Sequence, residues 1–416
     1  MPTPKKAAAP AAVSLVVPGF AHFGGLNDET ANLKNLLAFH GVTAPHTGKP
    51  YTEELLFGLG GGISCAYFVF EMCDGVHLFV GGRHSHEKTD GSFARRIAER
   101  VGAKPEIRET GGAKGAEAQL REALAAGKPA MTWLGRAGLP YHGLPIELLG
   151  YIMYTVVVYG IDDGKGIALL SDRCAGSASV TLEELSVARA RIGSLKNRTM
   201  TIEPPAKAPD LAKAVRAGIA DTVQALEGGK IANFGLSALE KWADLLANEK
   251  EKKGWPTLSK DGRAAYTLLK SAFEQIETTG TGGGAAFRMM FSRFLVEASE
   301  ILNKPALKAV AGNYGEAACH WAGVALAALP DSVPRLKETR GLLLERRATF
   351  EEKGAAGTAA VKKIGARLAA IEAEAAAKPF LKPEALRALR EELRARVVKL
   401  HDAEKRALAA LKAAVG

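Results

Sequence analysis

The sequence predicts an α+β N-terminal domain followed by an all-α C-terminal domain that ends in a helical tail. Up to about residue 204, β-branched apolar runs alternate with helical stretches and glycines, as in α+β domains. Three prolines within residues 204–209 then interrupt any helix or central strand. Beyond them almost every segment has helical periodicity.

These changes in pattern predict five segments. We expect a disordered lead (1–12), an α+β domain (13–203), a linker (204–209), a helical domain (210–330) and a basic helical tail forming a hairpin or bundle (331–416). Apolar residues recur at helical spacing in the tail, which predicts that it docks or forms a homodimer.

Within the first domain, residues 152–161 and 166–171 flank the turn Asp162-Asp163-Gly164 and predict an antiparallel hairpin. Further strands are expected at 66–70, 77–80 and 130–134, and helices at 30–40, 93–101 and 116–126. After the linker, helices are expected at 210–228, 236–252, 261–277, 285–303 and 304–329.

The chain has 416 residues, 47% of them hydrophobic, which excludes a disordered or fibrous protein. Its net charge of +10 suggests nucleic-acid binding, but the last 86 residues carry 19 basic and 12 acidic side chains, interspersed along alanine-rich helix. This pattern is typical of a solvated helical face, so we expect no nucleic-acid partner.

The four cysteines lack CxxC spacing, which predicts neither a zinc site nor a disulfide framework. Residues 148–161, the most hydrophobic segment, are too short to span a bilayer, and the lead lacks the apolar core of a signal peptide. We therefore expect a cytoplasmic protein without a membrane partner, a metal or a cofactor.

Polar residues gather where the loop from His22 enters the helix at Thr30. Asp28 and Glu29 lie at this helix start, where backbone amides favour an anion or a developing oxyanion. The alternative is a helix cap, in which Asn27 or Asp28 accepts first-turn amide hydrogens.

A glycine cluster, Gly60, Gly61 and Gly62, separates a helix from a strand and allows the backbone to approach a ligand or another segment closely. Its spacing differs from that of a phosphate loop or a dinucleotide fingerprint. Cys65 follows at the start of an apolar strand, where a buried thiol is a commoner interpretation than a nucleophile.

Two further patterns have a functional and a structural interpretation. His84, His86 and His142, with Glu87 and Asp90, form the one imidazole cluster that suits a metal, although polar loop histidines are commoner. A second glycine-rich loop opens a helix and suits a phosphate or carboxylate, or is only a flexible connection. Its candidate anion-binding residues are Gly282, Gly283, Gly284 and Arg288.

Several motifs together resemble the family of the butirosin-biosynthesis acyltransferase BtrH, with the helical domain of unknown function that accompanies it. The resemblance covers about residues 15–344. Its landmarks are the segments 33–41, 52–62, 139–141, 156–162, 240–243, 253–255, 280–284 and 294–298, together with Asp172.

The resemblance implies a papain-like N-terminal domain in which a cysteine nucleophile, a histidine base and an orienting aspartate transfer an acyl group from a carrier-protein thioester. The family's His-Cys pair falls on His22-Phe23 or on Asn27-Asp28, so neither register supplies a cysteine. Tyr154 stands at the position of the histidine, whereas the aspartate is retained as Asp172.

Three hypotheses follow. The protein is an acyltransferase or amide hydrolase of bacterial specialised metabolism in which Asp28 or Glu29 acts as base or nucleophile and Tyr154 as acid. Alternatively, it is a non-catalytic pseudoenzyme that binds a carrier protein, peptide or metabolite. In the third hypothesis, Cys65 acts as the nucleophile with His22 or His142 as its base.

We take the first hypothesis as the function that the sequence predicts. It implies an acyl-carrier or pantetheine thioester, or a small molecule or peptide, as substrate.

Overall fold

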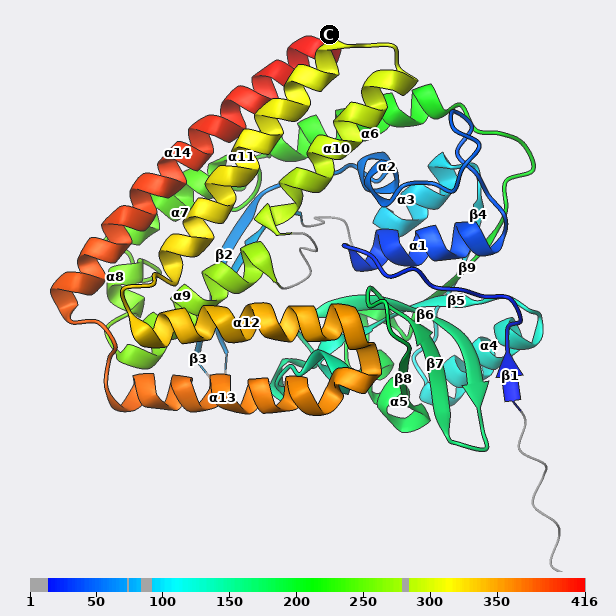
Figure 1. Ribbon diagram of the computed structural model, residues 1–416, viewed down its shortest axis with the longest axis horizontal. Helices are drawn as coiled ribbons and strands as arrows, with labels where there is room; N and C mark the ends of the chain where they lie inside the picture. The colour runs from blue at the N-terminus through cyan, green and yellow to red at the C-terminus, as the bar shows by residue number, and fades with distance from the viewer. Residues whose placement is uncertain (1–13, 73–74, 84–91, 279–283, 416) are drawn as a thin grey trace, which may run out of the picture.

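The computed structural model describes residues 14–72, 75–83, 92–278 and 284–415. The protein is α+β, with a sheet-containing N-terminal region and a helical C-terminal region, as the sequence predicts. Figure 1 shows the sheet at one end of the molecule and the long C-terminal helices at the other. No helix within the described ranges is both long and apolar enough to cross a membrane.

The main sheet is antiparallel and is centred on β6. Its strand order is β4-β9-β5-β6-β7-β8, and β1 also pairs with β6. The predicted hairpin at 152–161 and 166–171 is confirmed as β6 and β7. The strands are β1 (Ser14–Val16), β4 (Lys104–Arg108), β5 (Ala130–Gly135), β6 (Met153–Asp162), β7 (Ile167–Ser171), β8 (Ala178–Thr181) and β9 (Thr199–Glu203).

The two faces of this sheet enter two hydrophobic cores because successive strand side chains point to opposite faces. Val156 and Val158 of β6 join one core, whereas Val157 between them joins the other. The helices of this region are α1 (Asp28–Phe39), α2 (Glu53–Leu59), α3 (Ser92–Arg100), α4 (Ala113–Ala125) and α5 (Leu182–Ala190), with short 3-10 turns η1 (Arg136–Gly138), η2 (Pro140–His142), η3 (Ile146–Leu148) and η4 (Gly193–Leu195).

The predicted strands at 66–70 and 77–80 are confirmed, but they do not join the main sheet. They form a separate hairpin, β2 (Ala66–Met72) with β3 (Gly75–Gly81), that packs among the C-terminal helices. Trp255 Nε1 donates to the hydroxyl of Tyr67 on β2 at 2.9 Å, and the Tyr67 ring stacks on Trp242. A segment from the first half of the sequence therefore completes the core of the second half.

The C-terminal region is a helical assembly. It contains α6 (Leu211–Glu227), α7 (Ser237–Ala247), α8 (Trp255–Leu258), α9 (Gly262–Glu277), η5 (Ala285–Phe287), α10 (Arg288–Ile301), α11 (Ala306–Ala328), α12 (Pro334–Lys353), η6 (Gly354–Gly357), α13 (Thr358–Ala377) and α14 (Pro383–Val415). The helix expected from residue 285 begins at Arg288 instead, because Ala285, Ala286 and Phe287 all have positive φ angles.

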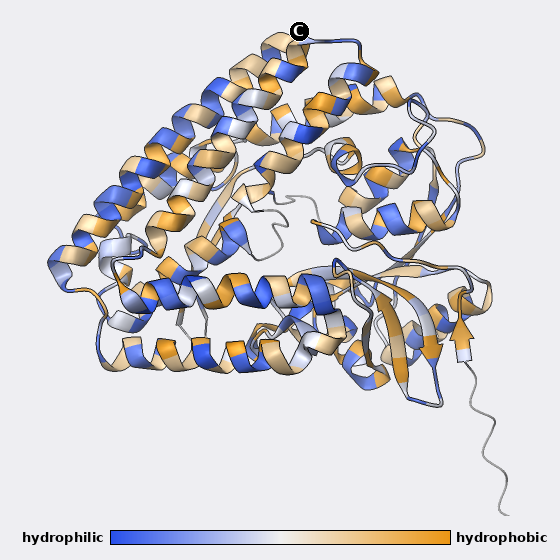
Figure 2. Ribbon diagram, in the orientation of Figure 1, coloured by the Kyte–Doolittle hydropathy of each residue, from blue (hydrophilic) through white to orange (hydrophobic). Residues whose placement is uncertain are grey.

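The tail contains a helical hairpin and a long separate helix. Figure 1 shows α12 and α13 side by side and α14 along α11. In Figure 2 apolar and polar residues alternate along these helices, and the buried apolar residues include Ile364, Leu393 and Val397. The apolar tail residues that predict docking therefore pack against other helices of the same chain. The homodimer stays a prediction, and a light-scattering mass of 43.9 kDa would contradict it.

Candidate functional site

The start of α1 lies against the start of β6. Asn27 caps the helix by accepting the Thr30 amide hydrogen at 3.1 Å, as one interpretation of the sequence proposes. Asp28 Oδ2 accepts hydrogen bonds from the backbone amide and the hydroxyl of Thr155, at 2.9 and 3.1 Å. Asn32 Nδ2, one turn along, also binds the Thr155 hydroxyl. These contacts fix the helix start beside Tyr154.

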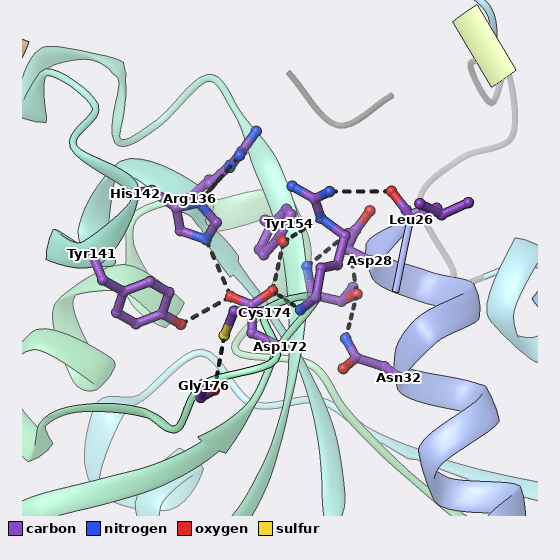
Figure 3. Close-up of polar contacts among 12 residues, drawn as sticks. Leu26, Asp28, Asn32, Arg136, Tyr141, His142, Tyr154, Asp172, Cys174 and Gly176 are labelled. Atoms are coloured by element: carbon purple, nitrogen blue, oxygen red, sulfur yellow. Dashed lines mark hydrogen bonds and ion pairs between the residues drawn. The ribbon is translucent and has the colours of Figure 1, made fainter. Parts of the chain in front are cut away.

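Asp172, which follows β7, accepts hydrogen bonds from four groups. Its Oδ1 accepts from the Tyr154 hydroxyl and the Arg173 amide, both at 2.6 Å, and its Oδ2 accepts from the Tyr141 hydroxyl at 3.0 Å and from His142 Nε2 at 3.1 Å (Figure 3). Burial opposes ionisation of Asp172. The hydrogen bond from His142 and the charge of Arg173 outweigh it and lower the pKa of Asp172 to about 2.

His142 is a neutral member of this cluster. Its Nδ1 accepts a hydrogen bond from Arg136 Nε at 3.2 Å, so the ring proton lies on Nε2 and is donated to Asp172. Burial, aided by the Arg136 cation, lowers the pKa of His142 to about 3. The histidine that we considered as a metal ligand is therefore occupied on both ring nitrogens.

Tyr154 is also fully engaged. Its hydroxyl donates to Asp172 and accepts a hydrogen bond from Arg173 Nε at 2.9 Å, while burial raises its pKa well above the usual value. The centre of the Phe350 ring on α12 lies 4.3 Å from the centre of the His142 ring and 6.0 Å from the centre of the Tyr141 ring. The helical tail thus covers a buried cluster whose members hydrogen-bond one another.

Glu29, the residue after Asp28, pairs with Arg83. Its Oε2 lies 3.1 Å from Arg83 Nη2, and both side chains are largely buried. Burial raises the pKa of Glu29 to about 7; Arg83 opposes the shift and Asp28 adds to it. Burial also raises the pKa of Asp28, against the charge of Arg173. Glu29 can therefore gain or lose a proton near neutral pH.

Arg83 also lines a cavity of about 530 Å³ between the two halves of the chain. Its guanidinium carbon lies 3.3 Å from the centre of the Phe93 ring, which lines the same cavity. The other lining residues are Gly60, Gly61, Gly62, Ile63, Ser64, Arg96, Asp221, Gln224, Ala225, Gly228, Gly229, Lys230, Ile231 and Phe234. Arg83 thus connects Glu29 to a cavity of the size that small ligands occupy.

The predicted glycine cluster lies at this cavity, but its amides are already used. The N–H groups of Gly60, Gly61 and Gly62 donate to carbonyls of α2, and Gly60 O accepts a hydrogen bond from Arg96. Gly62 has a φ of +54°, and a Cβ there would meet the Phe291 ring and the Thr222 hydroxyl. These glycines permit close packing and do not offer free amides to an anion.

Arg288, predicted to bind an anion, lies buried inside the protein. Its Nε donates to Glu404 on α14 at 2.6 Å, and its terminal nitrogens donate to the carbonyls of Gly82, Ala286 and Ser64 and to Cys65 Sγ. The protein's own carboxylate therefore takes the place of the expected anion.

In the rest of the predicted glycine loop, a carboxylate of the protein again occupies the anion position. The backbone amide of Ala285, which follows Gly284, donates to the Glu277 carboxylate. Gly282 and Gly283 lie outside the described residues.

Cys65 and His22 are held in separate environments. Cys65 is buried, and burial raises the pKa of its thiol to about 12 despite the nearby Arg288. His22 Nε2 contacts the carbonyls of Ala175 and Gly176, at 3.3 and 3.1 Å. These contacts do not favour a thiolate at Cys65.

The remaining metal candidates, His84, His86, Glu87 and Asp90, lie outside the described residues. Among the residues that are described, no cluster of three potential ligands suits a metal ion.

Three arginines of the site have no clear signal in the sequence. Arg83 pairs with Glu29, Arg136 donates to His142 and Arg173 donates to Tyr154, but these arginines come from different segments of the chain. The one local signal is that Arg173 directly follows Asp172.

Two family models match the chain. Residues 28–173 match the model described as butirosin biosynthesis protein H, N-terminal, and residues 183–357 match a domain of unknown function, DUF4872. No curated protein matches the chain. The first match contains the start of α1, β6 and Asp172, and the second contains α6 and Arg288. The chain therefore belongs to the proteins in which a butirosin biosynthesis protein H N-terminal domain precedes this domain of unknown function.

Proposed function

We propose that this protein handles acyl groups in bacterial specialised metabolism, as an acyltransferase or amide hydrolase with a papain-like N-terminal domain. The family match supports the acyl chemistry. The papain-like fold is supported by the meeting of a helix start, a strand start and a following aspartate, at Asp28, Tyr154 and Asp172. In the register that places the family's His-Cys pair on Asn27-Asp28, these are the positions at which the resemblance implies cysteine, histidine and aspartate.

Glu29 is the proposed general base, and the observation that supports this role most is its pairing with a residue of the cavity wall. It has a pKa near neutrality and pairs with Arg83, which lines the 530 Å³ cavity. A base works best when its pKa is close to the working pH. Asp172 and Tyr154 suit this role less because their polar atoms are already bound within the buried cluster.

The proposed reaction begins when a hydroxyl, amine or water that reaches the Glu29–Arg83 pair from the cavity loses its proton to a Glu29 carboxylate oxygen. The nucleophile attacks the acyl carbonyl carbon, whose π electrons move to oxygen. As the carbonyl re-forms, the bond to the leaving sulfur or nitrogen breaks, and the leaving group takes the proton from Glu29. The acyl donor is a carrier-protein or pantetheine thioester, or an amide of a small molecule or peptide.

A binding or scaffolding protein is the second candidate. The observation that favours it is the closed hydrogen-bond network around Asp172, in which His142 and Tyr154 have no free polar atom for a substrate. In that case the cavity holds a ligand without turnover.

The test incubates the full chain with acyl-pantetheine thioesters and follows thioester loss and the intact protein mass. We expect thioester loss that rises with pH through about 7. Glu29→Gln should reduce it by about a hundredfold, whereas Glu147→Gln, at an exposed position, should not. An adduct on Asp28 or Glu29 would indicate a carboxylate nucleophile, and one on Cys65 a thiol enzyme. No loss and no adduct would favour the binding protein.

A further inference from the structure

Among the described residues that line the cavity, cations outnumber carboxylates. Three cations, Arg83, Arg96 and Lys230, stand against one carboxylate, Asp221. That carboxylate is already shared between Arg96, at 3.3 Å, and Arg100, at 2.8 Å. Asp221 therefore already pairs with two arginines, and the other two cations of the lining, Arg83 and Lys230, are the ones that we consider for a negatively charged ligand.

The two remaining cations differ in their surroundings. Lys230 is exposed, and no ion pair or side-chain hydrogen bond is found for it in the described part of the chain. Arg83 is paired with Glu29. An anion at Arg83 must therefore compete with Glu29, and protonation of Glu29 removes that competition.

The rest of the wall is largely apolar. The apolar side chains that line it are Phe93, Ile63, Ile231 and Phe234. The Arg83 guanidinium stacks on the face of the Phe93 ring. A small ligand that fills about 530 Å³ would place an aromatic or aliphatic portion against these side chains.

We propose that this cavity binds a small amphipathic anion, with its acidic group at Arg83 and Lys230 and its apolar portion against Phe93 and Phe234. This inference deepens the proposed function, because it assigns a substrate class to the same cavity. Arg83 and Phe93 belong to the first family match, whereas Lys230 and Phe234 belong to the second. The ligand would therefore join the two domains and raise the melting temperature of the chain.

The test uses phenyl phosphate as the probe and phenol as its neutral counterpart, with isothermal titration calorimetry on the full chain. Phenyl phosphate should bind at least about tenfold more tightly than phenol, because only it forms charge-assisted hydrogen bonds. Lys230→Ala should weaken the binding of phenyl phosphate by about tenfold. Lys250→Ala, at another exposed lysine that does not line the cavity, should leave it unchanged.

A second variant, Glu29→Gln, should strengthen the binding of phenyl phosphate where Lys230→Ala weakens it. Above the pKa of Glu29, Glu29→Gln should tighten phenyl phosphate binding several-fold because Arg83 loses its internal counter-ion. The inference is overturned if phenyl phosphate does not bind, if phenol binds equally well, or if Lys230→Ala and Lys250→Ala behave alike. It is also overturned if Glu29→Gln weakens binding while the variant keeps the melting temperature of the parent chain.

The two proposals fail separately. Phenyl phosphate binding without any thioester or amide turnover would contradict the proposed function and leave the anion site in place. Turnover that depends on Glu29, without phenyl phosphate binding, would contradict the anion site alone.

Discussion

The hydroxyl of Tyr154 donates a 2.6 Å hydrogen bond to Oδ1 of Asp172, which joins the start of β6 to the residue after β7. The same hydroxyl accepts from Arg173. One phenol thus holds a buried carboxylate and a buried guanidinium in place. Because Arg173 also donates to the carbonyl of Leu26, just before α1, we infer that these three side chains stabilise the start of α1.

Tyr154→Phe should therefore destabilise the protein by about 1–3 kcal/mol, because Asp172 and Arg173 each lose a buried partner. Urea unfolding followed by circular dichroism measures this change. Tyr151→Phe, at a tyrosine that is 61% exposed, is the matched control and should have little effect. Equal stability of the two variants would show that the cluster does not depend on the phenol.

The contribution of His142 to stability should fall as the pH decreases below the usual pKa of histidine, whereas the raised pKa of Glu29 contributes in the opposite direction. Buried His142 has its pKa lowered to about 3, so the unfolded chain binds a proton that the folded chain excludes between about pH 6.5 and pH 3. This group alone should remove about 2 kcal/mol between about pH 7 and about pH 5.

Urea unfolding at several pH values checks this slope. His142→Gln should reduce it, whereas His320→Gln, at a partly exposed histidine of α11, should not. An unchanged slope in His142→Gln would contradict the prediction.

The buried ion pair between Arg288 and Glu404 should be essential for attaching α14. Glu404 also accepts the Trp321 indole hydrogen at 2.7 Å. Glu404→Gln should cost about 3–5 kcal/mol because it leaves a buried guanidinium without its counter-ion. Glu392→Gln, in an exposed pair with Arg396, is the control. Thermal and urea unfolding measure both, and a similar stability for the two variants would show that the buried pair is dispensable.

The cysteines should differ in their reactivity toward iodoacetamide near neutral pH. Cys319 is exposed and should be alkylated in the native protein. Cys65 and Cys174 should react only after unfolding, because burial raises the pKa of each thiol to about 12. Peptide mapping by mass spectrometry compares native and unfolded samples. Faster labelling of Cys65 than of Cys319 would restore the hypothesis of a thiol enzyme.

Local patterns in the sequence predicted much of the secondary structure. Alternating apolar residues and the Asp162-Asp163-Gly164 turn were sufficient to identify β6 and β7, and polar residues before Thr30 identified the start of α1. Short strands such as β8 and β9 were missed because four or five residues give little periodic signal. The helix expected from residue 285 was wrong in its start, since positive φ angles at alanine and phenylalanine have no signature in composition.

The sequence by itself determined the α+β class, the central hairpin, the helical second half and the resemblance that the family matches confirm. These follow from short-range periodicity, turn chemistry and motif spacing. Only the tertiary structure decided that His142 binds Asp172, that Glu29 pairs with Arg83, which lines a cavity, and that Arg288 pairs with Glu404, 116 residues away. Such pairs depend on how distant elements pack and on how burial changes the cost of charge, and neither is encoded in local sequence.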